Sequence, residues 1–214
     1  MTGMPEKFVI TVGRSFGSGG HTLAEALARH FGIAFYDKEL LSQAARKAGL
    51  SQDYFEQNDE REPRFLSGIF AFNMGFNPMH WYSGDSSISG DSIYKAQCDF
   101  IRDIAAKGPC VIVGRTADYV LRDMPNVVNI FVHAPADSCA RRIIGRSETP
   151  LSTQQAMTLA QKTNRLRANF YNFYSDKHWG RADSYDLTVD SSSMPFDSLV
   201  EFVADFVRRK LRNQ

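Results

Sequence analysis

Short apolar runs alternate with amphipathic segments along most of the 214 residues of the chain. Runs rich in β-branched and aromatic residues predict five buried strands, at 8–12, 33–36, 110–113, 127–132 and 187–189. Apolar positions at helical spacing predict helices at 22–31, 38–48, 51–60 and 91–106, and further helices that begin near residues 136, 152 and 196. Strands that alternate with helices indicate an α/β fold with a parallel sheet and right-handed crossovers.

The helix that follows Pro150 carries the most specific local signal. Ser152 and Gln155 have the spacing of a capping box, in which each side chain bonds a backbone amide of the other residue. The apolar pattern after this cap predicts an inward face made of Leu159, Thr163, Leu166, Phe170 and Phe173.

Residues 63–90 do not follow either period. This segment contains Pro63, Pro78, several glycines and serines, and a set of aromatic residues between Phe65 and Tyr82. A loop of this length within a compact domain is uncommon, and such loops serve as lids, binding loops or oligomer contacts. We therefore treat 63–90 as an irregular insertion in a single domain, either with a binding role or without any chemistry.

Composition and charge narrow the class of protein. The hydrophobic fraction of 43% and the charged fraction of 23% are those of an ordinary globular chain. The 25 basic and 24 acidic residues leave a net charge of +1, which predicts no nucleic-acid partner. Apolar runs too short to span a bilayer, and an N-terminus without an apolar signal core, predict a cytoplasmic protein with no membrane partner. Three widely spaced cysteines predict buried free thiols.

The strongest chemical signal is the glycine-rich stretch between the first predicted strand and the first helix, Gly13–Thr22. Glycines in this place let backbone amides turn toward phosphate oxygens, and the helix N-terminus adds partial positive charge. The stretch departs from the P-loop pattern, because Arg14 stands at its first glycine position and Gly20 at its lysine position. A tight turn that needs glycines only for its geometry is the alternative interpretation.

Four segments resemble the cytidylate kinase-like family, a branch of the nucleoside monophosphate kinases. They are Phe16–Thr22 (FGSGGHT), Phe35–Leu41 (FYDKELL), Val111–Leu121 (VIVGRTADYVL) and Asn169–Gly180 (NFYNFYSDKHWG). The resemblance covers nearly the whole chain and implies a three-layer P-loop kinase fold, in which a five-stranded parallel sheet has helices on both faces and a helical lid. It places the acceptor-binding region at 37–107 and the lid at 136–176.

The resemblance also implies ATP and Mg²⁺ as cofactors and a small nucleotide as substrate, and it leaves a homodimer open. The ATP phosphates would be held by Gly17, Ser18, Gly19, Gly20, His21 and Thr22, with Thr22 reaching the metal directly or through water. Catalytic cations would be Arg14, Arg141, Arg142 and Arg167, because phosphoryl transfer needs positive charge around the transferred group. The acceptor would be bound by Asp37, Arg115, Lys162, Asn164 and Arg165.

Several of these residues have simpler interpretations. Asp37 is also suited to cap the helix predicted at 38–48. Arg115 would equally pair with a structural carboxylate, and the lid cations would equally form a solvated face. His21 would equally cap or pack the first helix.

The motifs also differ from the family pattern. The Gly-Arg-Asp acceptor motif ends in Thr116, and the lid carries Asn164 where an aspartate is usual. Two functions therefore remain: ATP-dependent transfer to a nucleoside monophosphate, with CMP or dCMP as default, or a nucleotide-binding regulatory module with weak catalysis.

Overall fold

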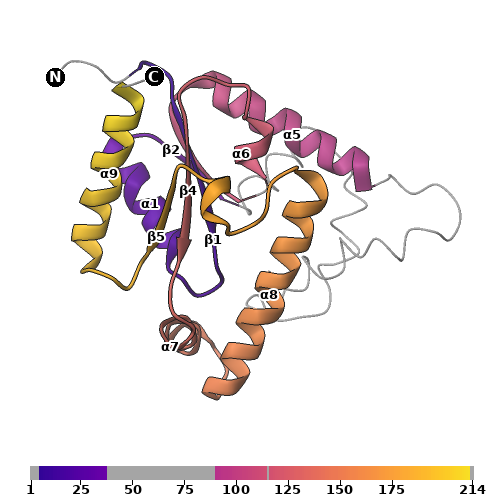
Figure 1. Ribbon diagram of the computed structural model, residues 1–214, viewed down its shortest axis with the longest axis vertical. Helices are drawn as coiled ribbons and strands as arrows, with labels where there is room; N and C mark the ends of the chain where they lie inside the picture. Colours follow the sequence, from indigo (N-terminus) through magenta and orange to yellow (C-terminus); the bar gives the residue numbers. More distant parts are fainter. Residues whose placement is uncertain (1–4, 38–89, 115, 213–214) are drawn as a thin grey trace, which may run out of the picture.

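A computed structural model of the protein describes residues 5–37, 90–114 and 116–212 (Figure 1). Five parallel strands form one sheet in the order β2-β3-β1-β4-β5. Their bounds are Val9–Arg14 for β1, Ala34–Tyr36 for β2, Cys110–Val113 for β3, Val127–His133 for β4 and Leu187–Asp190 for β5. The predicted parallel sheet of five strands is confirmed. The helices predicted at 38–48 and 51–60 and the insertion at 63–90 lie outside the described residues.

Strand β1 is the centre of the sheet because it pairs on both sides. Val9 is in register with Cys110 of β3 and with Val127 of β4. The strand continues past Gly13, where the sequence predicted its end, because Arg14 still pairs with Val132 of β4. Arg14 is therefore the last residue of a strand, and the loop that follows it starts from a fixed position.

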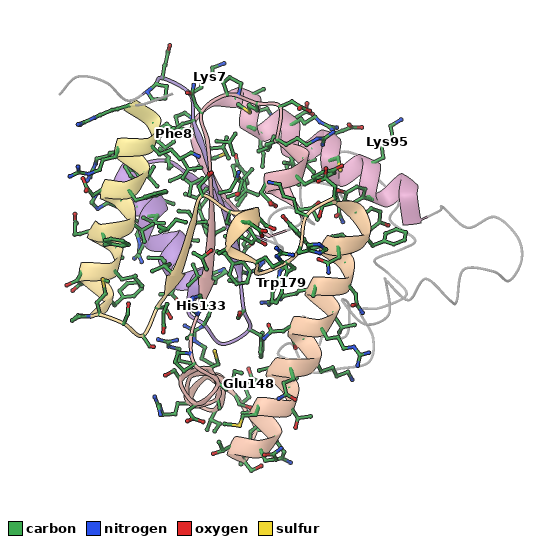
Figure 2. The ribbon with its side chains drawn as sticks, in the orientation of Figure 1. Lys7, Phe8, Lys95, His133, Glu148 and Trp179 are labelled. Carbon is green, nitrogen blue, oxygen red and sulfur yellow. The ribbon has the colours of Figure 1, made fainter. Side chains whose placement is uncertain are left out.

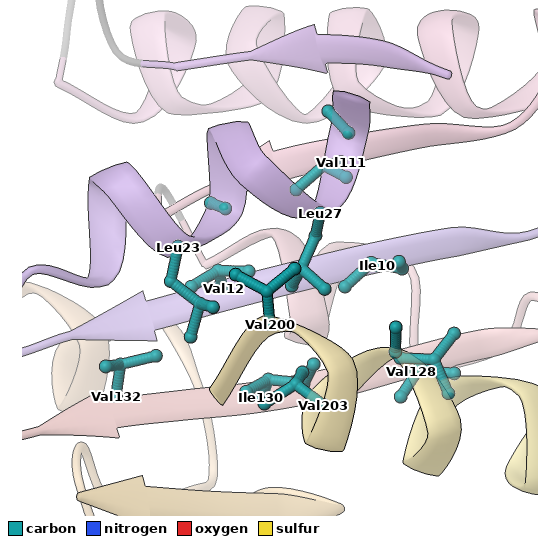
Figure 3. Close-up of a cluster of buried hydrophobic side chains, with 14 of the residues drawn as sticks. Ile10, Val12, Leu23, Leu27, Val111, Val128, Ile130, Val132, Val200 and Val203 are labelled. Atoms are coloured by element: carbon teal, nitrogen blue, oxygen red, sulfur yellow. The ribbon is translucent and has the colours of Figure 1, made fainter. Parts of the chain in front are cut away.

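Helices cover both faces of the sheet, as Figure 1 shows. Helices α1 (Gly20–Phe31) and α9 (Phe196–Arg212) pack on one face, and α5 (Gly90–Lys107) and the short α6 (Ala117–Val120) pack on the other. The core on the first face interleaves strand residues with apolar positions of the two helices (Figure 3), among them Ile10, Val12, Leu23, Leu27, Val128, Ile130, Val200 and Val203. This arrangement confirms the three-layer fold.

Helices α7 (Ala136–Arg146) and α8 (Thr153–Tyr174) form the segment predicted as a lid. Figure 1 shows α7 at the carboxyl edge of the sheet, next to the glycine-rich loop, and α8 running from there alongside the face that carries α5. The two helices pack through Ala140, Ile143, Ala156 and Ala160. Phe16 of the glycine-rich loop packs against this cluster, so the loop contacts both α7 and α8 through one apolar cluster.

Helix α8 begins with the predicted capping box, in which Ser152 Oγ accepts from the Gln155 amide at 3.2 Å. The predicted inward face is correct for Thr163 and Phe170 but wrong for Phe173, whose exposed fraction is 70%. Tyr171 is buried in its place. A helix of 22 residues meets α7 at one end and residues of α5 and α6 at the other, so its buried stripe shifts along its length.

The segment between α8 and β5 closes over the sheet. The indole ring of Trp179 meets Phe131 of β4 edge to face, with 5.1 Å between ring centroids, and lies between the sheet and α8 (Figure 2). The segment also contains a 3₁₀ turn, Ala182–Ser184. Cys98, Cys110 and Cys139 are buried free thiols, as predicted. Among the helices of the described ranges, not one is both long and apolar enough to cross a membrane.

Candidate functional site

The glycine-rich loop joins the end of β1 to the start of α1 through two left-handed residues. Gly17 has φ +79° and Gly19 has φ +81°, and Gly19 is the N-cap of α1. A Cβ atom on Gly17 would lie 2.7 Å from the carbonyl oxygen of Cys139, so space as well as backbone geometry requires glycine there. The first amides of α1 have no partner within the helix, and an anion at this N-terminus would satisfy them.

Arg142 of α7 holds the outer side of this loop. Its Nη1 donates to the carbonyl oxygens of Gly17 at 3.4 Å and Ser18 at 3.1 Å, and to Ser191 Oγ at 3.1 Å. Ser191, directly after β5, donates from its own hydroxyl to the Ser18 carbonyl at 2.5 Å. These bonds occupy the loop's carbonyl oxygens on one side, which leaves its amides directed elsewhere. Ser18 is fully buried, and its Oγ accepts from the Gly20 amide at 3.3 Å.

Helix α8 holds the beginning of the same loop. Asn164 Oδ1 accepts from the Phe16 amide at 2.7 Å, and Arg167 Nη1 donates to the Arg14 carbonyl oxygen at 2.9 Å. The Arg167 guanidinium also lies over the Phe16 ring, 5.5 Å from its centroid. Residues 14–19 are therefore tied to α7 at one end and to α8 at the other.

Arg14 itself runs along the carboxyl edge of the sheet. A Cβ on Gly20 would lie 2.6 Å from the Cβ of Arg14, and a Cβ on Gly114 would lie 2.2 Å from its Nη1. The side chain thus passes the start of α1, and its guanidinium lies against Gly114, the residue after β3. Burial and the nearby charge of Arg14 lower the pKa of the Arg167 guanidinium. Within the described ranges Arg167 makes no ion pair with a carboxylate.

Two further predicted residues meet beside the start of α1. His21 Nε2 lies 3.0 Å from Asp37 Oδ2, and the His21 ring packs edge to face on Phe35. Asp37 follows β2 directly, so this contact joins the loop to the start of the predicted acceptor region. Thr22 Oγ1 accepts from Arg146 Nη2 at 2.9 Å, which brings a third lid arginine to the loop.

Three of the remaining predicted cations, Arg141, Lys162 and Arg165, are not brought to the loop. Arg141 lies on the exposed side of α7 and donates to Ser138 Oγ at 3.1 Å. Lys162 and Arg165 are exposed on α8. Arg115 lies outside the described residues. Roles of these four in binding or transfer stay predictions.

Sequence reasoning did not identify two contributors near the site. Ser191 supports the loop, and a serine run directly after a strand that ends at the same edge was the available signal. Asp118 of α6 is buried and accepts a 2.5 Å hydrogen bond from Tyr171 of α8. Burial raises the pKa of Asp118, and burial together with the Asp118 charge raises that of Tyr171. This pair joins α6, which follows β3, to α8.

The geometry fits the phosphates of a nucleotide better than a protein-held metal. The loop combines Gly17 and Gly20, at which a Cβ would clash, the N-terminus of α1 and two nearby guanidinium groups, those of Arg142 and Arg167. No group of three metal-ligating side chains occurs within the part of the chain that the structure describes. Mg²⁺ is commonly bound through substrate phosphates with few protein ligands, and Thr22 stays the predicted protein ligand for it.

The fold agrees with comparisons to known proteins. The sequence profile of the cytidylate kinase-like family matches residues 9–193. A cytidylate kinase of Pyrococcus horikoshii is 25% identical over 189 residues, which cover 87% of this chain and 81% of that protein. An uncharacterized protein from Eubacterium ventriosum is similar in structure, with TM-score 0.69, 25% identity and coverage of 94% and 98% of the two chains. A gluconokinase from Sinorhizobium meliloti shares the fold, with TM-score 0.53, 16% identity and coverage of 99% and 97%.

Proposed function

The chain belongs to the cytidylate kinase-like family, and from this membership we propose that it transfers the terminal phosphoryl group of ATP to a nucleoside monophosphate. CMP or dCMP is the default acceptor, because the curated relative is a cytidylate kinase. The observation that carries the proposal is the glycine-rich loop at the N-terminus of α1, held from two sides by Arg142 and Arg167. Such a rigid loop suits a reaction that depends on positioning and charge.

The loop and the lid have different roles in binding ATP. Backbone amides at Gly19–Thr22 bind the phosphates, while Arg142 and Ser191 keep the loop carbonyls turned away from them. In the transfer, an oxygen of the acceptor phosphate bonds to the γ-phosphorus, the bond from that phosphorus to the β-bridging oxygen breaks, and ADP leaves. Bound Mg²⁺ neutralises charge on the phosphates. Cations around the γ-phosphoryl group stabilise the charge that spreads over its oxygens.

The acceptor side follows from the order of the strands. β2 and β3 are neighbours, so Asp37, which follows β2, and Gly114, which follows β3, start from the same edge of the sheet. Asp37 would accept from the acceptor nucleotide, with His21 fixing its carboxylate, and Arg115 would bind the acceptor phosphate. Asn164 supports the loop through the Phe16 amide, so its part in acceptor binding would be indirect. Lys162 and Arg165 would reach the acceptor only from the exposed side of α8.

A nucleotide-binding regulatory module is the second candidate. Gly20 stands where a phosphate loop usually carries its lysine, and a chain without that cation would bind nucleotide while transferring phosphate slowly. The retained lid arginines favour the kinase, since a binding module needs no cations around a transferring group.

A coupled assay of ADP release from ATP and Mg²⁺ tests the two candidates. CMP, dCMP, UMP, AMP and GMP are compared with a reaction that lacks an acceptor. We expect ADP release that depends on the acceptor, with a pyrimidine monophosphate giving the highest kcat/KM. ATP binding by calorimetry without turnover on any acceptor would instead support the regulatory module.

A further inference from the structure

Resting on the proposed phosphoryl transfer, we infer that Arg14 is the phosphate-binding cation of this site, in place of the lysine that Gly20 replaces. We further infer that Gly20 is a glycine because the stem of the Arg14 side chain runs across it, while the end of that side chain lies beside Gly114. The three residues thus form one unit, in which the cation comes from the last position of β1 instead of the first position of α1.

Space, not backbone conformation, requires glycine at position 20. Gly20 is the first residue of α1, and its φ lies outside the left-handed region that Gly17 and Gly19 occupy. A Cβ on Gly20 would lie 2.6 Å from Cβ and 3.3 Å from Cγ of Arg14, and 3.1 Å from Cβ of Val132. Carbon atoms at 2.6 Å overlap strongly, because optimal contacts are about 3.5–4.0 Å. A lysine at position 20 and an arginine at position 14 therefore exclude each other.

The end of the Arg14 side chain lies between the donor and acceptor halves of the site. A Cβ on Gly114 would lie 2.2 Å from Nη1 and 3.3 Å from Cζ of Arg14. Gly114 directly follows β3, which is paired with β1, and precedes Arg115 of the predicted acceptor region in the sequence. The Arg14 side chain thus starts beside the phosphate loop, and its guanidinium lies next to the residue that follows β3. A phosphoryl group that moves from ATP to the acceptor would pass between these two places.

Charge around Arg14 also favours an anion. Arg167 donates to the backbone oxygen of Arg14, and burial with the Arg14 charge lowers the pKa of Arg167. Each of these two cations disfavours the charged form of the other in a partly buried place. A phosphate bound between them would stabilise both charged forms. A guanidinium can also bind two phosphate oxygens at once through a planar pair of donors. An ammonium group acts instead as a compact point charge.

Three other basic side chains lie near the loop. Arg142 donates to loop carbonyls and Ser191, Arg146 donates to Thr22, and His21 pairs with Asp37. None of these three lies against Gly20, whereas the stem of Arg14 does. Arg14 is therefore the basic residue best placed to replace the missing lysine.

The test moves the cation from one position to the other. Arg14→Ala removes the charge but keeps the Cβ that blocks position 20, whereas Arg14→Gly also removes the block. We would compare wild type, Arg14→Ala, Arg14→Lys, Arg14→Gly, Gly20→Lys and the double variant Arg14→Gly with Gly20→Lys. Arg209→Ala is the matched control, because it removes an exposed arginine of α9 that pairs with Asp205 on the same helix. Pyrophosphate binding by calorimetry, thermal unfolding, and kcat and KM are measured for each.

We expect Arg14→Ala to weaken pyrophosphate binding about tenfold or more and to lower kcat by about 10²–10³, as for other groups that stabilise transition-state charge. Gly20→Lys alone should lower the unfolding temperature, since both side chains then compete for one space. The double variant should bind pyrophosphate more tightly than Arg14→Gly does. Arg14→Lys should keep part of the affinity, and Arg209→Ala should leave binding, stability and turnover unchanged.

Unchanged pyrophosphate binding in Arg14→Ala, or a Gly20→Lys variant as stable as wild type, would overturn the inference. Phosphoryl transfer that survives Arg14→Ala would overturn it while leaving the proposed function intact. Pyrophosphate binding that depends on Arg14, without transfer to any acceptor, would support Arg14 as the phosphate cation and overturn the proposed transfer. Wild-type protein that binds no pyrophosphate would overturn both.

Discussion

Arg142 on α7 donates from Nη1 to the carbonyl oxygen of Ser18, over 3.1 Å and across 124 positions of sequence. The same guanidinium reaches Gly17 and Ser191, so one side chain joins the lid helix, the phosphate loop and the end of β5. We regard Arg142 as a residue that positions the loop, because its donors already contact protein oxygens. The predictions below separate such positioning from direct contact with substrate.

Arg142→Ala is expected to loosen the phosphate loop. Hydrogen bonds from a charged donor contribute roughly 1.5–3 kcal/mol, so the variant should lose about that much free energy of unfolding and bind ATP more weakly. Arg141→Ala, its neighbour on the exposed side of α7, should stay within roughly 0.5 kcal/mol of wild type. Denaturant unfolding and ATP calorimetry measure both effects. Equal results for the two variants would show that Arg142 does not hold the loop.

Gly17→Ala is expected to destabilise the protein through backbone and space together. The left-handed conformation disfavours a side chain by roughly 1–2 kcal/mol, and the new Cβ would meet the Cys139 carbonyl oxygen at 2.7 Å. Gly145→Ala is the control, because nothing lies within 4 Å of its new Cβ and it is in helix α7. That control should gain roughly 0.5–1 kcal/mol. A thermal midpoint for Gly17→Ala at or above wild type would contradict the loop geometry.

The pair of Asp118 and Tyr171 predicts a dependence of stability on pH. Burial raises the pKa of Asp118 above its ordinary value of 3.8, so the folded state holds this proton more strongly than the unfolded state does. The resulting stabilisation is complete below that ordinary value and is lost as pH rises through the folded pKa. Relative to Asp118→Asn, wild type should therefore lose stability as pH rises from about 4 toward 8, as measured by denaturant unfolding.

Tyr171→Phe should destabilise more at a pH above the folded pKa of Asp118 than at a pH below it, because the phenol donates to a carboxylate that is ionised above that pKa. An unsatisfied buried acceptor costs roughly 1–3 kcal/mol. Tyr119→Phe is the control, since the Tyr119 hydroxyl makes no hydrogen bond to any residue that the structure describes. A loss for Tyr171→Phe that is the same at both pH values would mean that Asp118 does not ionise in the folded protein.

Asp37→Ala is expected to raise the KM of the acceptor about tenfold or more while changing the KM of ATP less, because Asp37 follows β2 on the acceptor side. His21→Ala should share part of this effect through the 3.0 Å contact, with a coupling of roughly 0.5–3 kcal/mol in a double-mutant cycle. Asp99→Ala removes an exposed carboxylate from α5 and serves as the control. Independent effects of His21 and Asp37 would argue that the imidazole does not orient the carboxylate.

Local patterns in the sequence were enough to predict much of the fold. Residues only a few positions apart predict the five strands, the glycine-rich loop and the helix that begins at the Ser152 capping box. The family resemblance added the lid and the order of the site along the chain. These features follow from periodicity and turn chemistry, which act over one or two turns of backbone.

Tertiary structure alone decided which of the basic residues contact the phosphate loop. Arg141 and Arg142 are adjacent in sequence, yet only the second reaches the phosphate loop, and Phe173 is exposed where the helical period predicted burial. The overlap of Arg14 with Gly20 and Gly114 depends on β1 lying beside β3, residues about one hundred positions apart. A sequence pattern shows which face of an element is apolar, but the partner that meets each side chain is fixed only when distant elements pack.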